Sequence, residues 1–472
     1  MDTEIKIGLF GVGLNTYWAQ FDGLLGRLTD YQEAIAKRLV NLGGHVIDAG
    51  MVDCPEKAEI AVDYLRRENV EMVFLFISTY ALSSTILPVV QDLKRPVILL
   101  NVQPESAIDY AKINAMGDRG KMTGEWLAHC QSCSVPEFAS VLNRARVTYD
   151  IVSGYMQEQQ VWTEVAEWLA AARVWHGMTR NRLGVLGHYY GGMLDVYADL
   201  TLHATTFGTH IEMLEMCELK SFREEVTVED IERKKLEFHR CFEVSARCDP
   251  EELNRAARTS VALDRLVQEH RLGSMAYYYE GYEGNEYENI VTSVIAGNTL
   301  LTGQGIPVAG ECEIKNAQAM KILSLLGAGG SFSEFYAMDF NDDVLLLGHD
   351  GPAHFAMADG KVGLVPLPVY HGKPGKGLSI QMSVKQGQVT LLSVGENQNG
   401  IFMLAAEGEA VPGPVLNIGN TNSRYRFNTG IREFINRWSK AGPSHHCAIG
   451  TGHQLPVLRK IAKLFHIQLI EV

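Results

Sequence analysis

Apolar and polar positions follow two different rhythms along the chain, and the change falls near Gly330. Before it, short apolar runs alternate with stretches in which apolar residues recur at helical spacing. Met72–Ile77 is apolar throughout, as is typical of a parallel strand covered on both faces. After Gly330, short stretches of alternating polarity are separated by Gly and Pro, which favours antiparallel strands. The pattern therefore predicts one change of fold class along the chain.

The first rhythm predicts two successive series of strands and helices. We expect the strands at 5–10, 45–48, 72–77, 96–101, 182–187, 210–213, 274–279 and 307–311. We expect the main helices at 30–42, 58–67, 157–175, 193–204, 228–239 and 250–271. Alternation of this kind predicts two doubly wound α/β domains, an N-terminal one over 1–178 and a central one over 179–330.

The second rhythm predicts an antiparallel, barrel-like β domain over 331–472. Its strands are expected at 344–347, 378–382, 388–394 and 401–406. The domain is expected to close with a helix over 430–439, a strand from His446, a helix over 454–465 and a strand over 467–472.

Composition narrows the classes of protein that this chain can belong to. A chain of 472 residues is too long for one core, and its 46% hydrophobic and 21% charged residues are ordinary for a globular protein. A net charge of −14 with scattered basic residues argues against binding nucleic acid or an anionic membrane through bulk charge. With no signal-like start, no apolar stretch near ~20 residues and eight scattered cysteines, we expect a cytoplasmic protein with reduced thiols. Cys130 and Cys133 are accordingly interpreted as two ordinary thiols.

The stretch 310–354 carries the strongest candidate chemistry. Glu311 follows a predicted strand and a glycine, Glu334 lies in a partly apolar run, and His349 ends an apolar strand. Oxygen and nitrogen donors from separate elements suit Mn²⁺, Mg²⁺ or Co²⁺. The tandem pair His445-His446 is a second source of imidazole, and strand alternation predicts that only one of the two faces a site.

Each of these residues also has a simpler interpretation. A glutamate after a strand is usually a solvated charge, and a histidine at a strand end is usually hydrogen-bonded in the core. His188 and the two tyrosines after it could stack on a sugar or simply pack in a turn. The glycines of Gly11-Val12-Gly13 could cradle a phosphate or form a tight turn, and the missing third glycine favours the turn.

Four short motifs resemble the L-arabinose isomerase family, which shares its fold with the L-fucose isomerases. They are Ala309-Gly310-Glu311, Gly330-Ser331-Phe332-Ser333-Glu334, Leu347-Gly348-His349 and Gly442-Pro443-Ser444-His445-His446. The resemblance implies a divalent metal, commonly Mn²⁺, held by Glu311, Glu334, His349 and His446. It also implies an N-terminal and a central α/β domain, a C-terminal β domain, and a hexamer with active sites between subunits.

The resemblance further implies an aldose–ketose isomerase that works through an enediol, with Glu311 and Glu334 as acid–base groups and no nucleotide cofactor. His188 and Tyr190 fall where the family places substrate walls. Asn15, Tyr17 and Trp18 are candidates for a wall offered to a neighbouring subunit.

The sequence departs from the family just after Glu334 and His349, so the reaction class is better indicated than the sugar. The net negative charge of the chain favours a neutral sugar over a phosphorylated one. Two alternatives remain: a non-catalytic sugar-binding or sensor protein on the same fold, and a nicotinamide-dependent oxidoreductase.

Overall fold

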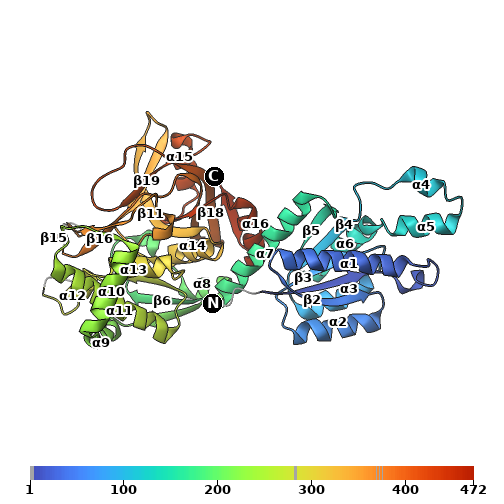
Figure 1. The fold of residues 1–472 in the computed structure, drawn as a ribbon, viewed down its shortest axis with the longest axis horizontal. Helices are drawn as coiled ribbons and strands as arrows, with labels where there is room; N and C mark the ends of the chain where they lie inside the picture. The colour runs from blue at the N-terminus through green and yellow to red at the C-terminus, as the bar shows by residue number, and fades with distance from the viewer. Residues whose placement is uncertain (1–4, 281–283, 368, 371–372, 375) are drawn as a thin grey trace. The chain divides into compact units, whose positions relative to one another are not determined.

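The computed structural model describes residues 5–280, 284–367, 369–370, 373–374 and 376–472. The chain forms two compact units, Met1–His176 and Gly177–Val472, and helix α7 (Gln159–Thr179) runs across their boundary. The first unit and the first part of the second contain parallel sheets, and an antiparallel barrel follows (Figure 1). The predicted fold class is thereby confirmed, and the exact domain boundaries stay predictions.

The first unit is a parallel sheet with the strand order β2-β1-β3-β4-β5. Its strands are β1 (Lys6–Val12), β2 (His45–Val52), β3 (Met72–Ile77), β4 (Val97–Gln103) and β5 (Tyr149–Tyr155). Its helices are α1 (Leu24–Asn41), α2 (Pro55–Arg67), α3 (Ser83–Leu93), α4 (Tyr110–Asn114), α5 (Arg119–Leu127) and α6 (Val135–Ala145). Every residue of β3 is buried, as its continuous apolar run predicts.

Gly11, near the end of β1, and Gly13, just after it, make room for side chains of the protein itself. A Cβ at Gly11 would lie 2.1 Å from Oε1 of Gln32, and one at Gly13 would lie 2.8 Å from the ring of Trp18. The indole Nε1 of Trp18 donates to Oδ2 of Asp53 at 2.7 Å, which holds the ring over the turn. Close packing by Gln32 and Trp18 therefore accounts for both glycines, and a tight turn is not needed at Gly11, which lies within the strand.

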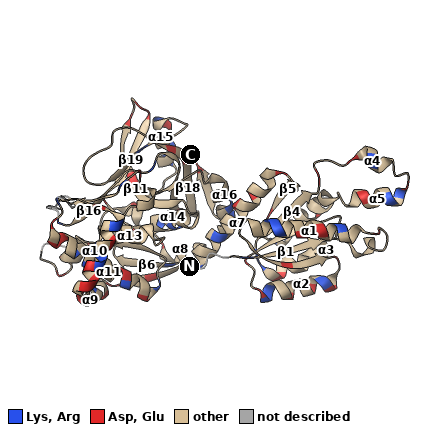
Figure 2. Ribbon diagram, in the orientation of Figure 1, with Lys and Arg blue, Asp and Glu red and all other residues tan. Residues whose placement is uncertain are grey.

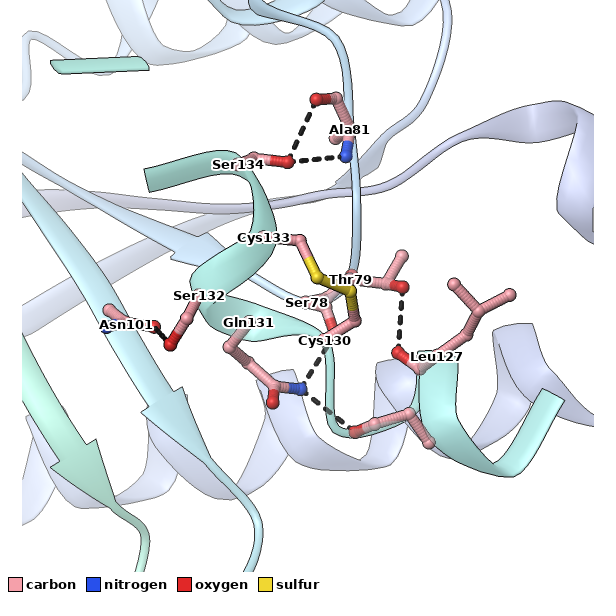
Figure 3. The surroundings of a disulfide bond; sticks show 11 residues. Ser78, Thr79, Ala81, Asn101, Leu127, Cys130, Gln131, Ser132, Cys133 and Ser134 are labelled. Carbon is pink, nitrogen blue, oxygen red and sulfur yellow. Dashed lines mark hydrogen bonds between the residues drawn. A yellow bond between two sulfur atoms is a disulfide. The ribbon is translucent and has the colours of Figure 1, made fainter. Parts of the chain in front are cut away.

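Cys130 and Cys133 form a disulfide, so the prediction of two ordinary thiols is wrong (Figure 3). A 3₁₀ turn, Gln131–Ser134, brings their Cα atoms to 5.4 Å, within the range that a disulfide can bridge. Hydrogen bonds from side chains of this turn reach Ser78 O at 2.9 Å and Ala81 O at 3.0 Å, which fixes the turn against the segment after β3. The other six cysteines are free, as expected.

The second unit begins with a parallel sheet of order β10-β9-β6-β7. Its strands are β6 (Arg182–Gly187), β7 (His210–Leu214), β9 (Ser274–Tyr278) and β10 (Val308–Ala309). The helices of this region are α8 (Leu200–Phe207), α9 (Met216–Glu224), α10 (Val228–Cys241), α11 (Pro250–His270), α12 (Glu288–Val291) and α13 (Ile295–Gly303). The strands and the long helices α10 and α11 lie where the apolar periodicity predicts them. The helix expected over 193–204 is instead a 3₁₀ turn, Leu194–Val196, followed by α8.

Six antiparallel strands then close into a barrel in the order β17-β20-β11-β12-β19-β18, with β18 pairing back to β17. They are β11 (Gly329–Asp339), β12 (Val344–His349), β17 (Gly387–Asn397), β18 (Gly400–Val411), β19 (Thr421–Arg426) and β20 (His446–Thr451). Closure removes the sheet edges, and β21 (Gln468–Glu471) adds to β18 in parallel. Helices α15 (Ile431–Lys440) and α16 (Leu455–Phe465) complete the C-terminal part.

The segment 378–382 was expected in the barrel, but β16 (Leu378–Gln381) belongs to a separate small sheet. It pairs with β13 (Gly363–Pro366), which in turn pairs with β8 (Glu243–Val244) from the preceding α/β region. A short strand carries no signal for its partner, so only the tertiary structure assigns it. A two-stranded hairpin, β14 (Val369–Tyr370) with β15 (Lys373–Pro374), lies beside this segment in the sequence.

Helix α14 (Ile314–Leu325) connects the parallel sheet to the barrel. It packs against β9 and β10 on one side and against β11, β17 and β20 on the other. Because both sides are covered, ten of its twelve residues are buried, including two lysines. The sequence analysis missed this helix, because polar and apolar residues alternate in it without a helical period.

Lys321 of α14 provides a test of this burial. Its Nζ donates to Gly305 O at 2.9 Å, and burial lowers its pKa from 10.5 to about 8. Between these two values the unfolded chain binds more protons than the folded one, so this group makes stability rise with pH from about 8 to 10.5.

Lys321→Met is expected to raise the free energy of unfolding at pH 7 by on the order of 2 kcal/mol, after subtracting one hydrogen bond. At pH 10 the gain should be smaller. Urea unfolding at both pH values checks this, and an equal gain at both would contradict it.

Among the described residues, basic and acidic positions are interspersed over both units (Figure 2). Within the described residues, every helix is too short or too polar to cross a bilayer.

Candidate metal centre

Glu311 lies in the loop that follows β10, at the carboxyl edge of the parallel sheet. It and Cys312 both have left-handed backbones, with φ of +55° and +58°. The Cys312 N–H donates to Tyr277 O of β9 at 3.1 Å, which ties the loop to the neighbouring strand. Non-glycine residues in this region cost on the order of 1–3 kcal/mol each and are frequent at functional sites. The surrounding structure therefore holds the Glu311 carboxylate in one place.

Three adjacent strands of the barrel supply the other groups. Glu334 lies on β11, between β12 and β20. The register places it opposite Gly348 on β12 and opposite His446 on β20. His349 is the last residue of β12 and His446 the first of β20, so His446 lies opposite Glu334 in the sheet and His349 follows Gly348, the partner of Glu334 on β12. These strands are antiparallel neighbours, and this pairing gathers residues that are far apart in sequence.

The four predicted ligands and His445 form two overlapping groups of three residues. Oε2 of Glu311 lies 3.5 Å from Nε2 of His446, and Oε1 lies 3.9 Å from Nε2 of His349. One ligand atom from each of Glu311, His349 and His446 lies within 4.8 Å of the others, and the same holds for Glu334, His445 and His446. His446 belongs to both groups. The separations of 3.5 and 3.9 Å can be spanned by a divalent ion with ligand bonds of about 2.0–2.2 Å.

The surroundings of His446 fit a metal ligand. The ring is fully buried, and its Nδ1 lies 2.5 Å from Oε2 of the buried Glu313. A carboxylate at Nδ1 holds the proton there and leaves the lone pair on Nε2. Within the described part of the chain, Nε2 has no hydrogen-bond partner. A buried polar atom in this state is unfavourable unless something binds it, and a divalent metal ion would do so.

His349 would have to change its protonation to serve as a ligand through Nε2. Gly351 N–H donates to its Nδ1 at 2.9 Å, which places the proton of the neutral ring on Nε2. A metal at Nε2 requires that proton on Nδ1 instead, so the contact with Gly351 would open. Phe332 packs against both imidazoles, with its ring centroid 4.5 Å from that of His349 and 4.4 Å from that of His446, and the two imidazole centroids are 5.3 Å apart.

His445 also faces this centre, contrary to the expectation that only one histidine of the pair would. Strand alternation does not apply, because His445 precedes the first residue of β20. Its Nε2 lies 3.6 Å from Oε2 of Glu311, and its N and Nδ1 both contact Oδ2 of Asp195, at 2.9 and 2.6 Å. The Glu311 carboxylate, with a further contribution from Asp195, raises the pKa of His445 to about 9.

Glu334 differs from Glu311 in its access to solvent. Its side chain is 32% exposed, against 9% for Glu311. Burial nevertheless raises the pKa of Glu334 above its ordinary value, although the neighbouring histidines act in the opposite direction. A carboxyl group that is accessible and holds its proton more readily is suited to proton transfer.

Two residues of the centre were missed by the sequence analysis. Glu313 lies in the same short stretch as Glu311, two residues on, and buried carboxylates beside a ligand motif are a signal that could have found it. Asp195 carries no local signal. It is placed by contacts distant in sequence, since Ser444 Oγ donates to its carbonyl at 3.1 Å and Lys315 Nζ donates to the carbonyl of nearby Tyr197, also at 3.1 Å.

His188 and Tyr190 follow β6, at the same edge of the sheet as Glu311. Both rings pack against Tyr278 at the end of β9, with centroids 5.6 and 4.8 Å away. They form part of an aromatic cluster on that edge, and their contact with a sugar stays a prediction. Asn15, Tyr17 and Trp18 lie in the first unit, just after β1, and their role towards a neighbouring subunit also stays a prediction.

Glu313→Gln is expected to weaken Mn²⁺ binding about 10- to 100-fold, because the amide holds the His446 proton less strongly than a carboxylate does. Titration calorimetry of Mn²⁺ into chelator-treated protein measures this. The melting temperature of the metal-free variant, compared with that of the wild type, separates a loss of ligand orientation from a loss of fold. The prediction fails if the affinity is unchanged.

Comparison with known proteins gives one family and several distant relatives. Residues 45–180 match the family described as the L-arabinose isomerase N-terminal domain. An L-arabinose isomerase of Herpetosiphon aurantiacus is 23% identical over 399 residues, covering 80% of this chain and 76% of that protein. An L-arabinose isomerase of Saccharophagus degradans is 20% identical over 483 residues, covering 95% and 91%.

A relative with a different substrate in its name also matches. It is a sulfoquinovose isomerase of Alkalicoccus urumqiensis, 23% identical over 226 residues, which is 48% of this chain and 50% of that protein.

Proposed function

Because the chain is a distant member of the L-arabinose isomerase family, we propose that it is an aldose–ketose isomerase acting on a small sugar through a metal centre. Glu311, Glu334, His349 and His446 would hold the ion. The observation that carries the proposal is the meeting of two carboxylates and three imidazoles from two different sheets, around a buried Nε2 that has no hydrogen-bond partner among the described residues.

Interconversion of an aldose and a ketose moves one proton between C1 and C2 and another between O1 and O2, with an enediol between the two sugars. When bound, a divalent ion would polarise the sugar carbonyl and stabilise the negative charge that develops on oxygen. The protein's own carboxylates do the rest, because both proton transfers need a group within hydrogen-bond reach of the reacting atoms.

We assign the two proton transfers to Glu311 and Glu334. Glu334 is the more accessible and its pKa is raised by burial, so it can take up the carbon-bound proton and return it to the neighbouring carbon. Glu311 is held by its strained loop beside His445, whose pKa is about 9 and whose proton offsets the carboxylate charge. This makes Glu311 suited to move the hydroxyl proton.

Mn²⁺ is the ion that we propose, with Mg²⁺ and Co²⁺ as alternatives. Two carboxylates with two imidazoles form a mixed oxygen and nitrogen donor set, which suits this group of ions. The buried Glu313–His446 pair supports this choice, because a histidine that ligates a metal commonly donates its other ring proton to a carboxylate.

The substrate is proposed as a class, a neutral or sulfonated pentose, hexose or deoxy-sugar. Relatives are named for L-arabinose and for sulfoquinovose, which supports the proposal of a class of sugars and not of one sugar. The residues just beyond Glu334 and His349, including Tyr336 and Asp350, differ from the family pattern and are where we expect the sugar to be selected. The aromatic cluster of His188, Tyr190 and Tyr278 supports a wall on which a sugar ring packs.

The proposal is tested by a screen of aldoses and ketoses with Mn²⁺ in D₂O, read by loss of the C2 proton signal. Exchange reports enediol chemistry even on a poor substrate. We expect exchange for at least one sugar, and none after the metal is removed with a chelator. Sugar binding without exchange would favour the sensor alternative, and turnover that requires NAD(H) would favour the oxidoreductase.

We also propose a homo-oligomer, a hexamer by resemblance to the family, in the cytoplasm. The loop containing Asn15, Tyr17 and Trp18 would then serve the site of a neighbouring subunit. Light scattering of the purified protein gives the mass, and a monomer that is fully active would overturn this part of the proposal.

A further inference from the structure

Three arginines line one cavity in the second unit. The cavity has a volume of about 410 Å³, a size typical of small-molecule sites. Among the described residues that line it, none belongs to the metal centre. The lining residues are Arg223, Val228, Ile231, Glu232, Asn254, Arg255 and Arg258.

Three helices form its walls. Arg223 lies in the last turn of α9, and Val228 and Ile231 lie in the first turn of α10. Arg255 and Arg258 are three residues apart on α11, which places them on the same face of that helix. Helix α11 packs against both α9 and α10, and this packing directs the three guanidinium groups to one cavity.

Two of the three guanidinium groups have no acidic partner in the described parts of the chain. Arg255 pairs with Glu252 and also contacts Thr292 Oγ1. Arg223 donates from Nε to the hydroxyl of Thr259 at 2.9 Å, and no described carboxylate lies within ion-pair distance of it or of Arg258. Positive charge is therefore concentrated at this cavity.

The acidic residue in the lining does not cancel this charge. Glu232 is already paired with Lys235, whose Nζ lies 3.0 Å from its carboxylate. The whole chain carries a net charge of −14, so an excess of cations at one cavity runs against the general balance.

The arginines also act on each other. Burial, and then the charges of Arg258 and Arg255, lower the pKa of Arg223 from 12.5 to about 10. Like charges held together in a partly buried place are unfavourable. An anion bound among them would offset both the repulsion and the loss of hydration.

We propose that this cavity binds a small molecule through a phosphate group. Guanidinium groups bind phosphate oxygens with paired, charge-assisted hydrogen bonds, and several of them together suit a doubly charged oxyanion. The volume exceeds what free phosphate needs, and the apolar side chains of Val228 and Ile231 offer a surface for the rest of an ester. The site is separate from the metal centre, so it stands whether or not the proposed isomerase activity is found.

Titration calorimetry of the full chain with inorganic phosphate, ribose 5-phosphate and ribose tests the proposal. We expect ribose 5-phosphate to bind with a Kd of about 1 mM or tighter, phosphate more weakly, and ribose not at all at this site. Equal binding of phosphate and ester would assign the site to the free ion. If neither anion binds, the proposal is overturned.

Two variants locate the binding. Arg258→Gln is expected to weaken ribose 5-phosphate binding at least about 10-fold, the loss of one charge-assisted contact. Arg240→Gln is the matched control, since Arg240 is an exposed arginine of α10 that does not line the cavity, and it should leave binding unchanged. Equal losses in both variants, or in neither, would overturn the assignment.

A further measurement keeps the test decisive if Arg258→Gln does not fold. Wild-type protein is treated with phenylglyoxal, and modification of Arg223 and Arg258 is followed by peptide mass spectrometry. Ribose 5-phosphate should slow modification of these two arginines several-fold and leave Arg240 unaffected. Absence of this protection would also contradict the proposal.

Discussion

Glu311→Gln and Glu334→Gln are each expected to lower turnover about 10²- to 10⁴-fold, the range that a positioned acid–base group contributes. The amide keeps the size of the side chain but cannot take up a proton. Loss of Glu311 also removes the carboxylate nearest to Nε2 of His446, so this variant should bind Mn²⁺ more weakly. Glu334→Gln should retain more of its metal affinity, because its side chain is the more exposed of the two.

The measurement is initial rate and C2 proton exchange on whichever sugar the screen identifies, at saturating Mn²⁺. Glu409→Gln is the matched control, since Glu409 is an exposed glutamate on β18 of the same barrel. It should have wild-type rates, and all three variants should have wild-type circular dichroism. Turnover within tenfold of wild type in either Glu311→Gln or Glu334→Gln would show that its carboxylate is not the acid–base group.

His446→Ala is expected to weaken Mn²⁺ binding by more than about 100-fold, since ligand orientation alone is worth about 10- to 100-fold. His445→Ala should have a smaller effect. His446 is fully buried, and its Nδ1 is held by Glu313, which leaves Nε2 directed at the centre. His445 is 35% exposed and its Nδ1 is engaged by Asp195, so its Nε2 is the more replaceable of the two.

Removing His446 also leaves the Glu313 carboxylate buried beside a void, which by itself is expected to cost about 3–5 kcal/mol of stability. The double variant His446→Ala/Glu313→Ala removes both partners and separates this cost from the loss of a ligand. Metal affinity is measured by calorimetry, and stability by thermal unfolding of the metal-free proteins. A larger effect of His445→Ala than of His446→Ala would mean that the first histidine of the pair is the ligand.

The parts of the fold that the sequence predicted are those whose burial has a regular period. β3 is buried on both faces, so its sequence is a continuous apolar run. α11 has one buried face, so its apolar residues recur at helical spacing. Helix α14 was missed because it is covered all round, which leaves its apolar and polar residues without a period. The partner of β16 could not be predicted, because strand pairing is decided by contacts distant in sequence.

In the candidate site, too, residues with a local sequence signal were predicted, and residues placed by distant contacts were not. Glu311, Glu334 and His349 were predicted because each follows, lies in or ends an apolar run, and the family resemblance added His446 and joined the four into one set. Asp195 was not, since it lies in a short 3₁₀ turn, Leu194–Val196, and reaches His445 across 250 positions of sequence. The expectation for His445 failed for a local reason. Side chains alternate between two faces only within a strand, and β20 starts one residue after His445.

Helix α14 also bears on attempts to change the substrate of this protein by directed evolution. Its buried residues fill the space between the parallel sheet and the barrel, and larger side chains there would push the two apart at a cost of about 1–3 kcal/mol each. Tyr336 and Asp350 are partly or fully exposed, and lie one or two residues beyond Glu334 and His349. A mutant library that varies the positions after these two residues and keeps α14 constant should therefore contain more folded members, and more of them with altered sugar preference.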